Sequence, residues 1–195
     1  MPRTSERGGP QTRARILEAA NRLFIERGFD SVTVAQVAKD AGVSSVTVFN
    51  HFPTKEDLFL DRSGDVEALL RSAAREPGDV VESLHRAMVG LADEEHAFSG
   101  LSERSVEFLR TVVGSPALIA RARGIAAGLQ RVLADELGPD GRILAVFFVN
   151  GYAAVFVETA AGLLAGAEPD ALAAGHRARL EALFEALRHG VGDGR

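Results

Sequence analysis

Residues 42–59 read GVSSVTVFNHFPTKEDLF, a stretch with helix-capping residues in two places. Ser44 is a residue type that caps helices, and a short helix is predicted from it to Phe52 or the residue before. Thr54 and Asp57 form a second capping pair, which predicts a new helix after the Pro-Thr turn. The short helix lacks the apolar stripe and charged back of a purely structural helix. Its outward face, rich in small hydroxyl and amide groups, is therefore expected to serve contacts outside its own domain.

Another short helix is predicted just before this one, over about residues 34–41. Thr33 and Gln36 make a capping box at its start, and its apolar residues fall on one face. The junction AGVS at residues 41–44 contains a glycine for a sharp turn and a valine that fills the apolar contact between the helices. Two short helices joined in this way form a helix-turn-helix, whose second helix is offered to the DNA major groove.

The second helix is expected to read DNA with its outward side chains, while Val48 and Phe52 face the first helix. Hydroxyls and amides can contact base edges and phosphates, and Val46 can press on a thymine methyl group. Lys55, at the start of the next helix, is placed for a phosphate, as are the free backbone N–H groups there. The outward residues are Ser44, Ser45, Thr47 and Asn50.

The composition is that of a globular protein with a real core and an uneven charge. The chain has 195 residues, of which 46% are hydrophobic and 25% charged, and it has no cysteine, which excludes disulfides and thiolate sites. Its net charge of −5 divides into +1 for residues 1–62 and −6 for residues 63–195. Four arginines against one glutamate in the first fifteen residues make a basic arm. No apolar leader is present there, so a cytoplasmic location is expected.

The rest of the chain predicts only helices. Prolines stand at breaks between segments of helical periodicity, and no segment alternates polar and apolar residues between hairpin turns. A first helix is expected over residues 12–27, ended by Gly28. The expected organisation is a flexible basic arm (1–11), a DNA-binding domain (12–60) and an all-helical body (61–195). The further predicted helices cover residues 54–75, 79–95, 102–114, 117–137, 141–165 and 170–190.

Two ordered stretches, TRARILEAANRLFIERGFDSVTV at 12–34 and VAKDAGVSSVTVFNHFPTKEDLF at 37–59, resemble the DNA-binding domain of the TetR family of transcriptional regulators. The resemblance implies an all-α fold of about nine helices. An N-terminal three-helix helix-turn-helix domain would precede a C-terminal helical bundle that dimerises through its last two helices. It also implies a repressor that binds a palindromic operator as a homodimer and is released by a small effector. The body resembles the family only in its length, its all-helical character and its pair of C-terminal helices.

Position by position, the resemblance carries the family's DNA contacts onto this sequence. Two departures matter, because the family often has a basic residue where Ser45 stands and usually a tyrosine where Phe49 stands. Without that hydroxyl one common phosphate contact is lost, so the arginines of the arm are expected to carry more of the affinity and to make it steeply dependent on salt. The implied contacts are Thr33, Ser44, Ser45, Val46, Thr47, Phe49, Asn50, His51 and Lys55.

The most apolar run is residues 143–165, ILAVFFVNGYAAVFVETAAGLLA. It could just span a bilayer by its length, but Asn150, Glu158 and Thr159 within it, and the lack of basic flanks, argue against a membrane. A helix that is apolar all round is more simply buried on all sides, here between the core and a second subunit. Helix 170–190 adds large apolar residues to this predicted four-helix dimer interface, namely Leu172, Leu180, Leu183, Phe184 and Leu187.

The body is also rich in phenylalanine, which suggests a small-molecule site. An apolar cavity with a few polar groups is what such a site requires, although the same phenylalanines could simply fill the core. The expected effector is apolar or amphipathic, such as an acyl or aromatic compound. In the alternative, a protein partner controls the DNA-binding domain and the body has no small-molecule site. The candidate ligand residues are Phe108, Phe147, Phe148, Asn150, Tyr152 and Phe156.

The sequence gives little support to an enzyme. Its five histidines show no metal-ligand spacing, and it has neither a Gly-rich phosphate loop nor a GxSxG elbow. The cluster DEEH at 93–96 is interpreted as a solvated helix end rather than a metal site. No catalytic residue, metal or cofactor is therefore expected.

Overall fold

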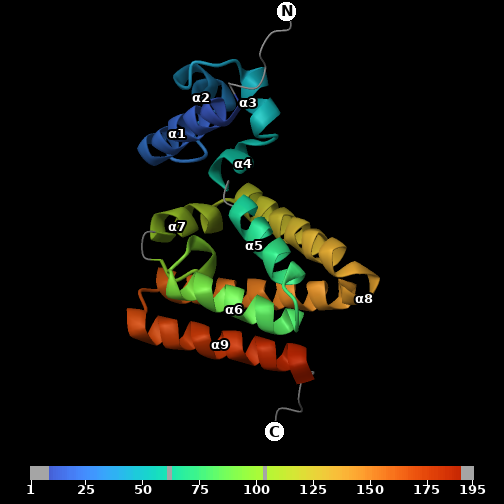
Figure 1. Ribbon diagram of the computed structural model, residues 1–195. Helices are drawn as coiled ribbons and strands as arrows, with labels where there is room; N and C mark the ends of the chain where they lie inside the picture. Colours follow the sequence, from blue (N-terminus) through green and yellow to red (C-terminus); the bar gives the residue numbers. More distant parts are fainter. Residues whose placement is uncertain (1–8, 61–62, 103–104, 190–195) are drawn as a thin grey trace, which may run out of the picture. The chain divides into compact units, whose positions relative to one another are not determined.

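The computed structural model of the chain describes residues 9–60, 63–102 and 105–189 (Figure 1). These residues form nine α-helices and one short 3-10 helix, with no strand among them, so the all-α prediction is confirmed. The chain divides into two compact units, residues 1–61 and 62–195. Residues 1–8 of the predicted basic arm lie outside the described part, and the arm's last three residues belong to the first helix, which begins earlier than predicted.

The first unit holds α1 (Gly9–Arg27), α2 (Val34–Asp40), α3 (Ser45–His51) and α4 (Lys55–Phe59). The last three of these helices each begin at a capping side chain predicted from the sequence. Thr33 caps α2 in a reciprocal pair with Gln36, and Thr54 caps α4 in the same way with Asp57. Ser44 caps α3. Short helices of this kind depend on their caps, because each has few internal hydrogen bonds of its own.

The core of the first unit brings all four helices together. Val37 of α2 and Val48 of α3 are fully buried. The rings of Phe24, Phe29 and Phe59 pack against one another with centroids 5.3–5.7 Å apart, in tilted and edge-on arrangements. Aromatic pairs of this geometry add to the stabilisation from buried area. This ring cluster holds α4 against α1 and so fixes the helix that follows α3.

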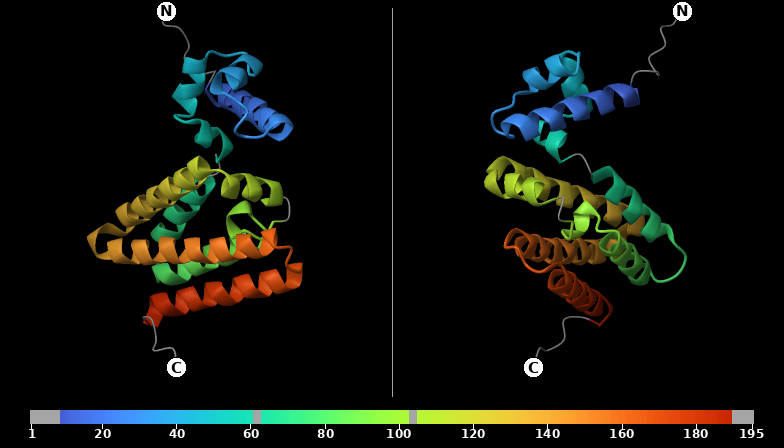
Figure 2. Two further views of the ribbon diagram at one scale, coloured as in Figure 1. Left: turned by 180° about the vertical axis from the view of Figure 1, so that it is seen from behind. Right: turned by 90° about the vertical axis from the view of Figure 1, so that its left-hand side faces the viewer.

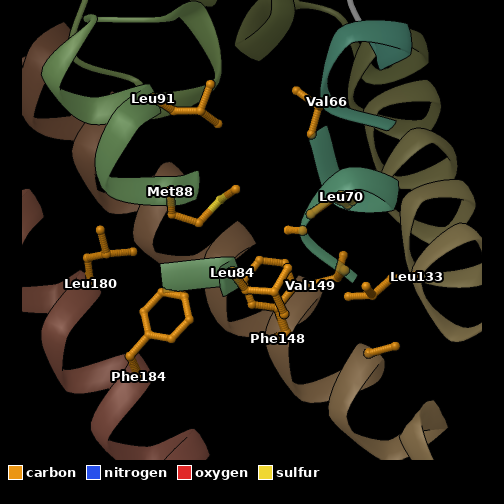
Figure 3. Packing of buried hydrophobic residues seen from close by; sticks show 12 residues of the cluster. Val66, Leu70, Leu84, Met88, Leu91, Leu133, Phe148, Val149, Leu180 and Phe184 are labelled. Atoms are coloured by element: carbon orange, nitrogen blue, oxygen red, sulfur yellow. The ribbon is translucent and has the colours of Figure 1, made fainter. Parts of the chain in front are cut away.

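The second unit is a helical bundle around one main core. Side chains from α5, α6, α8 and α9 meet in its centre (Figure 3). Leu84, Phe148 and Phe184 are almost fully buried there, and burial of each side chain of this size contributes about 1.5–3 kcal/mol. The elements are α5 (Ser63–Arg75), α6 (Val80–Asp93), the 3-10 helix η1 (Ala97–Ser99), α7 (Val106–Gly114), α8 (Pro116–Leu164) and α9 (Pro169–His189).

The long helix α8 is bent in its middle. Gly138 has φ 73° and ψ −170°, outside the helical region, and Pro139 follows it. The two arms of α8 diverge from this bend, and α9 runs along the second arm (Figure 2). The helices predicted over residues 117–137 and 141–165 are therefore the two arms of one bent element.

Two sequence predictions of helix boundaries are wrong. The helix predicted over residues 54–75 is in fact two helices, α4 and α5, which belong to different units. Ser63 and Gly64 are poor helix formers, and apolar periodicity does not reveal a break beside them. Residues 61 and 62, where the sequence places the domain boundary, lie outside the described residues. The helix predicted from residue 102 begins at Val106, and residues 103 and 104 of the predicted range lie outside the described residues.

Candidate functional site

The turn between α2 and α3 fixes the position of the recognition helix α3. Gly42 has φ 65°, a left-handed conformation that other residues rarely adopt. The N–H of Val43 donates to the carbonyl of Ala38 at 2.9 Å, which closes the end of α2. Ser44 then starts α3, because its Oγ accepts from the N–H of Thr47 at 3.1 Å. These contacts form the sharp turn of a helix-turn-helix.

Two arginines of α1 hold this turn from behind, and the sequence interpretation missed both of them. Arg15 donates from Nη2 to the carbonyl of Ala41, the residue that ends α2. Arg22 forms an ion pair with Asp40. The two arginines are seven residues apart and so share one face of α1, which is the signal that could have paired them with the end of α2. Together they tie α1 to the turn before α3.

One face of α3 carries exposed apolar and amide side chains. Val46 is 69% exposed and Phe49 49%, and Asn50 lies exposed beside them. Large apolar side chains at such exposure form a surface that suits a partner. Val48 and Phe52, on the opposite face, are buried, as the sequence predicts. The helix therefore separates a core face from an outward face.

The other predicted contacts on and near α3 lie at the edges of this face. Ser45, Thr47 and His51 are half-buried on α3. The hydroxyls of Ser44 and Thr47 lie 2.9 Å apart, so each already has a partner within the cap. Thr33 is exposed at the start of α2, outside the recognition helix. The structure thus brings the predicted contacts on α3 together. Ser44 and Thr33, in contrast, act as the N-terminal caps of α3 and α2.

Lys55 is held close to the first unit rather than extended from it. Its Nζ lies 4.2 Å from the centroid of the Phe29 ring, a cation–π contact, and 3.4 Å from the carbonyl oxygen of Asp30. A cation kept in one place loses less side-chain entropy when it meets a phosphate. Lys55 is consequently a preorganised cation at the start of α4.

The candidate ligand residues lie in three different environments of the second unit. Phe147 and Asn150 are exposed on the second arm of α8. Phe148 lies in the main core and stacks on Tyr152, whose hydroxyl donates to the carbonyl of Phe98 at 3.0 Å. Burial raises the pKa of the Tyr152 phenol. The remaining two candidates, Phe108 and Phe156, pack on a smaller apolar cluster between α7, α8 and α9.

A small hollow of the second unit lies elsewhere, between α6 and α9. Its walls include Val89 of α6 and both His176 and Leu180 of α9. None of the candidate ligand residues lines it. The predicted ligand residues therefore do not converge on this hollow.

The second arm of α8 and the helix α9 also present an exposed apolar surface, which we call the α8–α9 face. Three of the large α9 residues that the sequence predicts at a dimer interface do not lie on this face. Leu172, Leu180 and Phe184 are buried inside the unit itself. Periodicity identifies the residues that share a face, but not what covers them. The α8–α9 face consists of Ile143, Val146, Phe147, Ala154, Val157 and Ala161 on α8 and of Ala171, Ala178 and Ala182 on α9, all exposed.

By length and composition, α8 alone among the described residues is a helix that could cross a membrane. One third of its most apolar window is buried inside the protein. Its apolar character has two sources that need no lipid: core residues such as Phe148 on one side and the α8–α9 face on the other. Asn150 and Glu158 are exposed within the same stretch, and polar groups there disfavour contact with lipid.

Residues 16–61 match the family model described as "Bacterial regulatory proteins, tetR family". The matched range begins within α1 and contains all of α2, α3 and α4. It therefore covers the turn, the recognition helix and the helix that carries Lys55.

Relatives with curated names match over part of the chain. The HTH-type transcriptional regulator AcrR of Shigella flexneri is 34% identical over 94 residues, which are 46% of this chain and 44% of AcrR. The HTH-type transcriptional repressor AcnR of Corynebacterium glutamicum is 34% identical over 95 residues, 48% of this chain and 47% of AcnR. The chain thus spans about half the length of the curated relatives that it matches.

A solved structure extends the likeness to the second unit. A TetR-family regulator from Streptomyces coelicolor A3 is similar with a TM-score of 0.57 and 26% identity, over 95% of this chain and 99% of that one. The predicted arrangement of an N-terminal helix-turn-helix domain followed by a helical domain is confirmed. The relatives are transcriptional regulators and not enzymes.

Proposed function

We propose that this chain, a TetR-family transcriptional regulator by its helix-turn-helix and its relatives, represses transcription in the cytoplasm by binding a palindromic operator as a homodimer. The observation that carries the proposal is the outward face of α3, where Val46, Phe49 and Asn50 are exposed after a fixed turn. A helix of this kind enters the major groove, where an amide can bond a base edge and an apolar group can contact a thymine methyl. The name of the relative AcnR supports repression.

The proposed dimer forms through the α8–α9 face. Large side chains on α8, such as Phe147 and Val157, are exposed there, and the neighbouring α9 offers alanines. Large residues of one copy can pack over small residues of another, so that the two helix pairs form a four-helix interface. A two-fold dimer would set two copies of α3 about one turn of DNA apart, roughly 34 Å, and would require a palindromic site.

The proposed effector is a small apolar or amphipathic molecule that binds the second unit and favours a form with lower DNA affinity. Such an effector shifts the population only by its difference in affinity for the two forms. One observation favours the alternative, in which a protein partner controls the regulator. The candidate ligand residues, Phe147 and Tyr152 among them, lie in separate environments rather than around one cavity.

The test of repression is transcription in vitro from a promoter that carries a site bound by the protein. Repression predicts that transcript yield falls as the site fills, while a template with a scrambled site is unaffected. An increase in transcript, or equal inhibition of both templates, would contradict it. Acyl and aromatic compounds added to the repressed reaction test the effector, which is expected to restore transcription from the intact template alone.

A further inference from the structure

Arg179 of α9 is a cation without a charged partner among the described residues. Its Nη2 donates to the hydroxyl of Thr159 on α8 at 3.2 Å, and its guanidinium folds back over Gly175. Its Nε is shielded from solvent and makes no hydrogen bond. No carboxylate of the described residues lies within ion-pair distance of it, whereas the nearby Arg177 pairs with Asp93. A partly buried guanidinium in this state is costly unless an anion reaches it.

The groups around Arg179 do not neutralise its charge. The Thr159 hydroxyl gives its proton to the carbonyl of Val155 at 2.8 Å, so it accepts from both Arg179 and Nδ1 of His176, the latter at 3.0 Å. His176 is only 1% exposed. Burial lowers the pKa of His176, and the charges of Arg179 and Arg177 lower it further. The cluster therefore contains a fixed positive charge and neutral partners only.

Glu158 of α8, in sequence beside this cluster, is an anion without an ion-pair partner among the described residues. It immediately precedes Thr159 and is exposed on α8, where it is the only acidic residue between positions 141 and 167. No ion pair engages it among the described residues. Two acidic residues of α9 are already in contact with histidines: Glu181 with His85 at 2.9 Å, and Glu185 with His189 at 3.5 Å. Glu158 differs from the other carboxylates of these two helices because it adjoins Thr159, the residue to which Arg179 donates.

We propose that Arg179 of each subunit pairs with Glu158 of the other subunit, an inference that rests on the homodimer proposed above. Two-fold symmetry makes each such contact occur twice. The contact supplies an anion to the shielded guanidinium and a cation to the one carboxylate on an apolar stretch of helix. It also fixes the register in which the two helix pairs pack. The ligand of this site is thus a second copy of the chain.

The test mixes two charge-reversal variants, Arg179→Glu and Glu158→Arg. Each variant alone would place like charges together at both sites, so its self-association is expected to weaken by more than about tenfold. In the mixed dimer, Glu at 179 meets Arg at 158 at one site, and the native pair re-forms at the other. Mixing is therefore expected to restore the affinity to near that of the wild type. Sedimentation velocity of one fluorescently labelled variant, titrated with the other unlabelled, measures this directly.

The controls separate this inference from the dimer on which it rests. Arg177→Glu reverses a nearby charge of α9 that already has an internal partner, and it should leave self-association unchanged. Circular dichroism confirms that each variant is folded. A monomeric wild type would refute the dimer itself. Single variants that associate like the wild type would leave the dimer standing and refute the ion pair. A chain that carries both substitutions is measured as well. If it regains self-association while the mixture of single variants does not, the contact lies within one chain and the proposal is overturned.

Discussion

We expect Asn50 to be the side chain of α3 that distinguishes one base from another. It is exposed on the outward face, and its amide can both donate and accept at an adenine edge. We predict that Asn50→Ala weakens binding to the cognate site by about 1–3 kcal/mol, with little change on random DNA. Thr47→Ala should act in the same direction. Fluorescence anisotropy with both duplexes measures the two affinities.

The matched control for this substitution is Asn21→Ala, on the exposed surface of α1, which should leave both affinities unchanged. An equal loss on cognate and random DNA after Asn50→Ala would mean that another face of the unit reads the sequence.

Lys55 is expected to contribute to affinity without contributing to sequence choice. Its ammonium group is held over Phe29 and can meet a phosphate, which carries no sequence information. We predict that Lys55→Ala lowers the affinity for cognate and random duplexes alike and reduces the slope of log K against log salt by about one. Titrations at several salt concentrations measure the slope. A loss confined to the cognate duplex, or an unchanged slope, would contradict a phosphate contact.

At the scale of elements, the position of α3 depends on α1 through Arg15. Its hydrogen bond to the carbonyl of Ala41 satisfies the end of α2 next to the turn. We predict that Arg15→Gln lowers the stability of the first unit by about 1 kcal/mol and weakens specific binding more than binding to random DNA. Thermal unfolding and anisotropy test both effects. Arg27→Gln, at the exposed end of α1, is the control, and Arg15→Lys should restore part of the loss.

The joint between α5 and α8 predicts a dependence on pH. Glu136 accepts hydrogen bonds from Arg71 and Arg75, at 2.6–2.8 Å. The bonds from Arg75 and then Arg71 lower the pKa of Glu136. Its stabilising effect is therefore full above the unfolded pKa of about 4.3 and is lost as pH falls through the lower folded pKa.

We accordingly predict that Glu136→Gln lowers the melting temperature at pH 7, and that the difference from the wild type shrinks below about pH 4. Thermal unfolding followed by circular dichroism across this range measures the difference. A difference that stays constant with pH would show that the loss comes from packing rather than from the carboxylate charge.

The sequence predicted the starts of α2, α3 and α4 well because their causes are local. Thr33, Ser44 and Thr54 each cap a helix through a hydrogen bond that spans three residues. Contacts between distant segments were not predictable in this way, as with Arg15 and Ala41, which are 26 positions apart. A residue's type also does not reveal what covers it.

Neighbours in the second unit show this limit for the candidate ligand site. Phe147 is exposed while Phe148 lies in the core, and Leu180 fills its own subunit rather than an interface. Periodicity placed these residues on helices, but only the packing of α8 against α9 shows which of them are buried and which are exposed. The helix-turn-helix, by contrast, was recognisable from a short ordered pattern.

At the scale of the whole molecule, the proposed dimer makes Val157 a decisive position. It is 61% exposed on the α8–α9 face, the same exposed fraction as Val113 on α7. We predict that Val157→Glu converts the dimer to a monomer, since the interface would bury an unpaired charge, whereas Val113→Glu leaves it a dimer. Sedimentation velocity distinguishes the two. A Val157→Glu variant that dimerises as well as the Val113→Glu control would place the interface elsewhere.

The proposed function requires that a dimer of this chain reads a specific DNA sequence through α3. Selection of bound duplexes from a random library by the purified full-length protein tests it most directly. The expected result is a palindrome whose half-sites are centred about one helical turn, roughly 34 Å, apart. Recovery of no preferred sequence, or of one isolated half-site without symmetry, would contradict it.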